Sequence, residues 1–124
     1  MTDNNKDIAV AFLEMASNGE VKDAYSQFVG SSFRHHNPFF EGSAASLVAG
    51  MEENAREYPD KKIEVKRVIA EGDFVAVHSH VRLDPNSQGV AVVHIFRFEN
   101  GRIVELWDVG QSVPENMQNQ YGVF

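Results

Sequence analysis

The sequence has no cysteine among its 124 residues, and this absence removes several kinds of chemistry. Disulfide bonds, thiolate zinc sites and cysteine nucleophiles are all excluded. Long apolar runs are missing too, so no segment is expected to span a bilayer. The opening residues, MTDNNKDIAVAF, lack the basic start and extended apolar core of a signal peptide. Since a chain without disulfides suits a reducing compartment, we expect a cytoplasmic protein.

Positive charge is also scarce. The chain carries 11 Lys and Arg residues against 18 Asp and Glu residues, which gives a formal net charge of −7. Nucleic acids and anionic membranes attract basic surfaces, so neither is expected as a partner. A hydrophobic share of 43% and a charged share of 23% are ordinary for a globular protein. At this length we expect one domain over residues 1–124, with 113–124 as a C-terminal tail.

Apolar spacing predicts helices in the first half of the chain. Helical periodicity covers three segments, which are Asp3–Asn18, Glu20–Val29 and Ser43–Tyr58. We expect Thr2 or Asp3 to cap the first helix and Gly19 to end it. The segment SSFRHHNPFFEG is expected to be irregular, because Pro38 and Gly42 interrupt it.

Strand patterns follow in the second half of the chain. In order they are IEVKRVIAEG, DFVAVHSHVRL, GVAVVHIFRF and RIVELWDVG. Helices followed by a run of antiparallel strands are typical of an α+β fold. If such a sheet curves strongly around the helices, it leaves a pocket between the layers that suits a small ligand.

The segment VVHIFRFENGRIVELWDVGQ predicts a β-hairpin, because two apolar runs flank an Asn-Gly pair. With a two-residue loop, His94 would lie opposite Trp107, and Asp108 would lie on the other face. With a three-residue loop and Gly101 left-handed, His94 would lie opposite Leu106 and share its face with Asp108. We favour the three-residue loop because it gathers the apolar residues on one face.

Several strings of this sequence resemble one protein family. They are HHNP, EGDFVAVHSHV, VVHIFRFENGRIVELWDV and a closing PEN…GVF, within the order helix, helix, HHNP, helix, strands. The chain thereby resembles the SnoaL-like polyketide cyclases of the nuclear-transport-factor-2-like superfamily, and within them the predicted aldol-condensation enzymes. The resemblance covers nearly the whole chain. It implies N-terminal helices packed into a strongly curved mixed, mainly antiparallel sheet (a cone-shaped α+β barrel), with a hydrophobic pocket and no cofactor.

The resemblance also implies a role for Asp108 and His94. In characterised cyclases of this group, an aspartate near the end of the last long strand is the acid or base of an aldol closure, and Asp108 matches it. Apolar neighbours would desolvate Asp108 in part and make it a better general base. His94 matches a pocket histidine on the preceding strand and would hold an enolate oxygen or shuttle the proton. The alternatives are a turn-capping or arginine-paired Asp108 and a buried structural His94.

His36 and Asn37 are candidate ligand-binding residues. Pro38 forces an extended or turn conformation on Asn37, which would place an imidazole at the pocket mouth. The resemblance favours His36 and Asn37 over His35 as the recurring pair. The alternative is that they only fix the loop through hydrogen bonds.

His78 and His80 are two further candidate ligand-binding residues, and they point to the same face of their strand. Together with His94 they would suggest a three-histidine metal site. An HxH pattern alone is a weak signal, and the resemblance implies no metal. We therefore expect hydrogen bonding from this pair.

The second face of the predicted hairpin carries Arg97 and Glu105 together, and Trp107 aligns there with Ile103, Ile95 and Val93. A sheet face with isoleucine and tryptophan needs cover from a helix or a second subunit. Since two-fold dimers are the commonest assembly, we expect a homodimer through this face.

These expectations point to a small-molecule pocket protein. The leading hypothesis is a cofactor-independent acid–base enzyme that acts on a carbonyl compound by aldol-type cyclisation, condensation or isomerisation. Its partner would be a small apolar or carbonyl-containing molecule. A non-catalytic ligand-binding or dimerisation module is the second hypothesis, and epoxide-hydrolase-like activation of water is the third.

Overall fold

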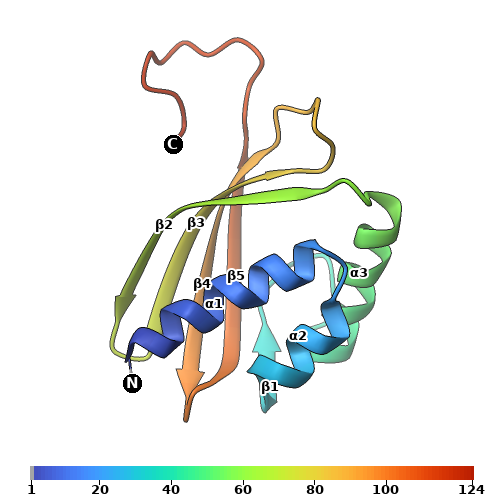
Figure 1. Ribbon diagram of the computed structural model, residues 1–124, viewed down its shortest axis with the longest axis vertical. Coiled ribbons are helices and arrows are strands. Elements are labelled where there is room, and N and C mark those ends of the chain that lie inside the picture. The colour runs from blue at the N-terminus through green and yellow to red at the C-terminus, as the bar shows by residue number, and fades with distance from the viewer. Residues whose placement is uncertain (1) are drawn as a thin grey trace.

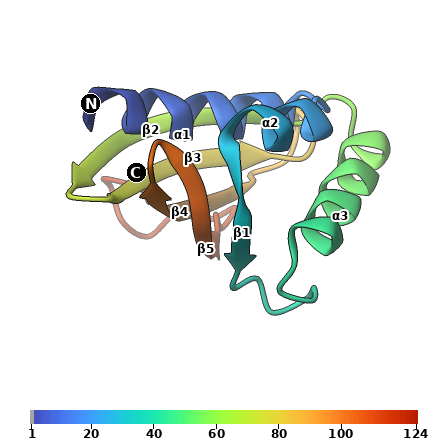
Figure 2. The ribbon, with the colours of Figure 1, turned by 90° about the horizontal axis from the view of Figure 1, so that it is seen from below.

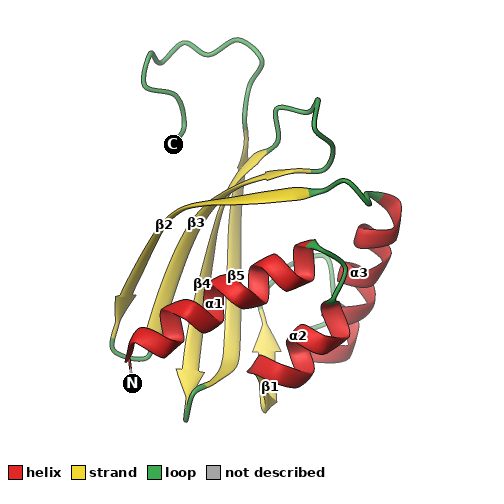
Figure 3. Ribbon diagram, viewed as in Figure 1, coloured by secondary structure: helices red, strands yellow, loops and turns green. Residues whose placement is uncertain are grey.

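The structure, a computed structural model, describes residues 2–124, with side chains from Asn5 onward (Figures 1 and 3). The described helices are α1 (Thr2–Ser17), α2 (Val21–Phe28) and α3 (Ala44–Glu57). The strands are β1 (Val29–His35), β2 (Lys62–Glu71), β3 (Phe74–Arg82), β4 (Val90–Glu99) and β5 (Arg102–Ser112). The three predicted helices and four predicted strands are therefore confirmed, whereas the cap at Thr2 or Asp3 lies outside the described side chains. None of the helices in residues 2–124 is long and apolar enough to cross a membrane.

The strands form one mixed sheet in the order β1-β5-β4-β3-β2. The pairs from β2 to β5 are antiparallel, and β1 adds to β5 in parallel. The sheet curls around α1 without closing, so β1 and β2 remain its two edges (Figure 2). The α+β fold and the strongly curved, mainly antiparallel sheet are as predicted.

Residues 29–35 form β1, so the prediction that SSFRHHNPFFEG is irregular is wrong for residues 31–35, whereas residues 36–42 form no helix or strand. Only two side chains of β1, Phe33 and His35, are buried. The strand forms because β5 offers a free edge for pairing, with Arg34 opposite Glu105. A short edge strand with few apolar residues has almost no pattern of its own.

The core lies between the helices and the concave face of the sheet. The ring of Phe12 from α1 packs edge-on against Tyr25 of α2 at 5.2 Å and against Phe96 of β4 at 5.9 Å. Phe12 and Phe96 are fully buried, as are Val77 and Leu106 on the neighbouring strands. Burial of these large apolar side chains fixes the helix layer on the sheet and sets the inward direction of β3, β4 and β5.

The hairpin between β4 and β5 turns on two residues, so the three-residue loop is wrong. Asn100 and Gly101 both have positive φ, 51° and 77°, as a type I′ turn requires. Glu99 is therefore paired with Arg102.

A β-bulge three residues beyond the turn restores the arrangement of the two ionisable residues. The register shifts by one residue between Arg97 and Phe98, because Val104 is an extra residue on β5. His94 is consequently paired directly with Asp108. The prediction that these two side chains share a face is confirmed, but the bulge rather than the turn is its cause.

Candidate active site

A cavity of about 270 Å³ lies between the helices and the concave face of the sheet. Apolar side chains from α1, α3 and three of the strands form most of its wall. The lining residues are Leu13, Ala16, Ser17, Met51, Lys61, Ile63, Val81, Val92, His94, Asp108 and Gly110. Its ionisable groups are one carboxylate, one imidazole and one amine, a set suited to proton transfer on a small ligand.

Asp108 supplies the carboxylate and is held by Asn37 from the loop after β1. The Asn37 amide Nδ2 donates to Asp108 Oδ2 at 3.1 Å and lies 3.5 Å from Oδ1. The amide is itself oriented, since its Oδ1 accepts from the Phe39 backbone N–H at 3.0 Å. Asn37 therefore reaches the cavity residues through Asp108 and fixes the carboxylate in place.

His94 supplies the imidazole from the middle of β4. Burial lowers the pKa of His94 to about 4, while the charge of Asp108 raises it and that of Lys61 lowers it further. The imidazole is therefore neutral at neutral pH. Its Nδ1 is buried and has no hydrogen-bond partner among the described residues, so a ligand in the cavity would meet the ring through Nε2.

Lys61 supplies the amine, and its place in the site was not predicted from the sequence. Its backbone N–H donates to the Tyr58 carbonyl oxygen at 3.1 Å, and its Nζ donates to Asn54 Oδ1 at 2.6 Å. Both bonds tie Lys61 to the end of α3. Burial lowers the pKa of the Lys61 ammonium. A signal was present, because Lys61 shares the period of two with Ile63 on the inward face of β2.

The HHNP segment divides between the two sides of the sheet. His36 does not reach the cavity: its ring stacks on Trp107 at 4.9 Å, and its Nε2 lies 2.6 Å from Glu105 Oε2. His35 is buried, its Nδ1 accepting from the Asn37 N–H at 3.1 Å. The His35 Nε2 has no partner among the described residues. Of the predicted pair, only Asn37 joins Asp108.

His78 and His80 lie on the outer face of β3, away from His94. The Nδ1 of His78 contacts the Arg67 guanidinium, and His80 Nε2 lies 2.7 Å from the Gln88 carbonyl oxygen. The three histidines therefore do not converge. Within residues described by the structure, no group of three or more His, Asp or Glu side chains is arranged to hold a metal ion.

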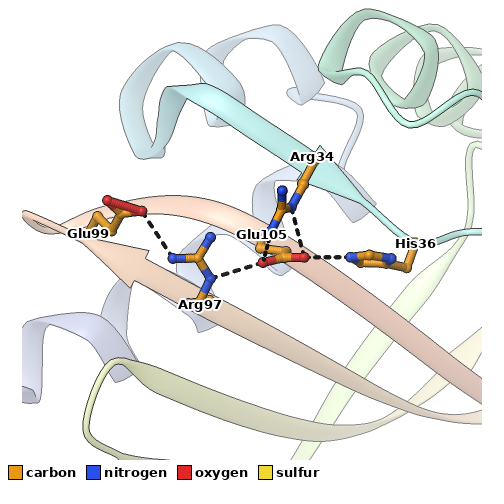
Figure 4. Close-up of polar contacts among 5 residues, drawn as sticks. All are labelled: Arg34, His36, Arg97, Glu99 and Glu105. Atoms are coloured by element: carbon orange, nitrogen blue, oxygen red, sulfur yellow. Dashed lines mark hydrogen bonds and ion pairs between the residues drawn. The ribbon is translucent and has the colours of Figure 1, made fainter.

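Glu105 forms an ionic cluster on the outer face (Figure 4). Its carboxylate accepts from Arg34 Nε at 3.0 Å and Arg97 Nε at 2.9 Å, besides its contact with His36. Hydrogen bonds from Arg34, His36 and Arg97 lower the pKa of Glu105 to about 2. The cluster ties β1, β4 and β5 together, and the predicted proximity of Arg97 and Glu105 is confirmed.

The curled sheet with helices on its concave face is the fold of the nuclear-transport-factor-2-like class. A protein of this class from Cytophaga hutchinsonii is similar in structure, with a TM-score of 0.67 and 19% identity over 86% of this chain and 89% of that one. Residues 9–106 match the SnoaL-like domain, and the chain belongs to that family.

Two further solved structures share the fold. AclR of Streptomyces galilaeus, a proposed hydroxylase, is 24% identical with a TM-score of 0.73 over 90% of this chain and 91% of that one. A proposed SnoaL-like polyketide cyclase from Jannaschia sp. is 18% identical with a TM-score of 0.71, over 89% and 87% of the two chains. No curated protein sequence matches this chain.

Proposed function

We propose that this protein is a cofactor-independent acid–base enzyme that acts on a small carbonyl compound by aldol-type cyclisation, condensation or isomerisation. Membership in the SnoaL-like family supports cyclase or isomerase chemistry at the family level. The observation that carries the proposal is the direct pairing of His94 with Asp108 on the wall of one largely apolar cavity.

Asp108 is the base in this proposal. Its carboxylate takes a proton from the carbon next to the substrate carbonyl, and Asn37 keeps the accepting oxygens oriented. The electron pair of the broken C–H bond moves onto the carbonyl oxygen and forms an enolate. The neutral His94 then donates a hydrogen bond to that oxygen. The enolate carbon attacks a second carbonyl or takes the proton back at another position.

The test uses α-proton exchange, which needs no knowledge of the natural substrate. The ketone 2-tetralone is incubated with the protein in deuterium oxide, and loss of its α-proton signal is followed by NMR. The wild-type protein should accelerate exchange, and Asp108→Asn should lower the enzyme-dependent rate by about 100-fold or more, the usual contribution of a general base.

Asp23→Asn is the matched control, because Asp23 is exposed in the first turn of α2, away from the cavity. It should retain the wild-type rate. Full exchange by the Asp108→Asn protein would contradict the proposal. Binding of 2-tetralone by the wild-type protein without any exchange would favour the non-catalytic ligand-binding module.

Hydrolase-like activation of water remains the weaker candidate. That chemistry normally uses more than one acid, and Asp108 is the only carboxylate among the described residues that line the cavity.

A further inference from the structure

We propose that Lys61 captures aldehyde or ketone substrates covalently, as a Schiff base on its Nζ. The inference rests on the proposed function, because it assigns a second reactive group to the same cavity. It also narrows the substrate class to compounds whose carbonyl carbon is open to attack by an amine.

The first argument is position. Lys61 lines the cavity together with His94 and Asp108, and its charge is close enough to lower the pKa of His94. Two hydrogen bonds to the end of α3, through Tyr58 and Asn54, hold the residue at the cavity wall. A nucleophile fixed beside the acid–base pair is a geometry that intramolecular attack requires.

The second argument is the absence of a counterion. Lys22 and Lys66 lie 3.9 Å and 2.9 Å from glutamate carboxylates, which stabilise their ammonium forms. Among the side chains described from residue 5 onward, Lys61 has no carboxylate within ion-pair distance, and its Nζ meets an amide oxygen instead.

Burial of the amine lowers its pKa, which increases the fraction that is unprotonated at neutral pH. Only the unprotonated amine has the electron pair that attacks a carbonyl. Amine desolvation in an apolar pocket is one of the ways in which proteins activate a lysine nucleophile.

The chemical step balances without an oxidant or reductant. The Nζ electron pair forms a bond to the carbonyl carbon, and the carbonyl π electrons move to the oxygen. The proton lost by Nζ goes to that oxygen and gives a carbinolamine. Loss of water forms the C=N bond, so amine and carbonyl compound yield an imine and one water molecule. Protonated, this imine withdraws electrons more strongly than the carbonyl and makes the α-proton easier for Asp108 to remove.

The experiment traps the imine on the full chain. Benzaldehyde and sodium cyanoborohydride are added at neutral pH, and the reduced product, a benzyl group on nitrogen, is located by peptide mass spectrometry. We expect Lys61 to be modified before the exposed lysines. Lys61→Met should lose this product, and Lys62→Met should keep it, because the adjacent Lys62 side chain is exposed.

The pH dependence provides a second readout. Because burial lowers the pKa of Lys61, its labelling should reach half-maximum at a lower pH than the labelling of free Nα-acetyllysine. Modification of exposed lysines with Lys61 left unlabelled would overturn the proposal.

A third variant separates this inference from the proposed function. Lys61→Arg retains a positive charge and cannot form a Schiff base, so it should lose acceleration of 2-tetralone exchange. If Lys61→Arg exchanges at the wild-type rate while Asp108→Asn does not, covalent capture is wrong and acid–base catalysis stands. If neither substitution changes the rate, both are wrong. A thermal unfolding transition at the wild-type temperature verifies that each variant is folded.

Discussion

Three ionisable residues of different kinds line one apolar cavity, and each is held by a different part of the fold. Asp108 is oriented by the loop residue Asn37, and Lys61 is fixed by Asn54 at the end of α3. His94 has no such partner, and its Nδ1 is buried without a hydrogen bond among the described residues. An unpaired buried nitrogen costs stability, so His94 occupies this position at a cost to folding.

The protonation of His94 predicts how stability depends on pH. The pKa of His94 falls from 6.5 to about 4 in the folded protein, because burial disfavours the imidazolium. Between these values the unfolded chain binds a proton that the folded chain does not. His94 should therefore lower the free energy of unfolding as the pH drops from above 6.5 towards 4. The expected loss is up to about 3 kcal/mol.

Urea unfolding of the wild-type protein and His94→Gln at neutral pH and near pH 4 measures this contribution. The substitution should remove that part of the pH dependence. His80→Gln, on the outer face of β3, is the control and should leave the His94 contribution in place. An identical pH dependence in the wild-type and His94→Gln proteins would show that His94 is not desolvated.

At the level of the elements, the β4–β5 hairpin places two residues of the site. A two-residue turn alone would have put His94 and Asp108 on opposite faces, and the extra residue Val104 reverses this. β1 packs closely on the bulge, since a Cβ added to Gly30 would lie 3.2 Å from Val104 Cγ1. The parallel edge strand and the bulge are therefore in close contact.

The turn makes a prediction about stability. Gly101 has a φ of 77°, and a Cβ added there would meet no atom within 4 Å. Gly101→Ala should therefore cost about 1 kcal/mol, the backbone cost of a left-handed residue with a Cβ. In Gly42→Ala the added Cβ would meet only the His35 carbonyl oxygen, at 3.7 Å, and the change should be within about 0.5 kcal/mol.

The urea unfolding midpoints of the two alanine variants, each compared with the wild-type protein, measure these two losses of stability. Equal losses at Gly101 and Gly42 would mean that the left-handed turn does not set the stability of the hairpin.

The hairpin also shows what the sequence could predict. Alternation of apolar residues was enough to find β4 and β5 and the Asn-Gly turn between them. The alternation could not locate the bulge. Ile103 and Val104 are both apolar and both buried, so the sequence does not show which of them is the extra residue. The edge strand β1 was missed for a related reason, since its pairing with β5 rather than its own composition determines it.

The candidate site could also be predicted only in part from the sequence. Asp108 and His94 stand out as ionisable residues in apolar strands. Lys61 is followed by Lys62, and a pair of lysines after a helix looks like a solvated turn. His36 could not be assigned to a side of the sheet because its direction depends on the unpredicted β1. The contact between Asn37 and Asp108 joins residues 71 apart and arises only from the tertiary fold.

On the scale of the whole molecule, the outer face of the sheet is only partly covered. The C-terminal residue folds back onto one end of it: the Phe124 ring lies 4.6 Å from the His80 ring, and Arg67 Nη2 donates to the Phe124 backbone oxygen at 2.7 Å. At the other end the His36 ring stacks on Trp107, while Phe74 beside Trp107 is 45% exposed.

We propose that two copies of the chain associate through the exposed apolar side chains of the outer face. Ile69 and Val109 are 64% and 65% exposed there, beside Phe74 and Trp107, and exposed apolar side chains gathered on one sheet face favour a two-fold partner. Sedimentation velocity at micromolar concentration should show a dimer. Val109→Glu should shift it to monomer, because a desolvated carboxylate would have no partner at the contact.

Phe39→Glu, at an exposed loop residue outside the sheet, should leave the protein dimeric. A wild-type protein that sediments only as monomer, or a Val109→Glu variant that stays dimeric, would rule out this face as the contact.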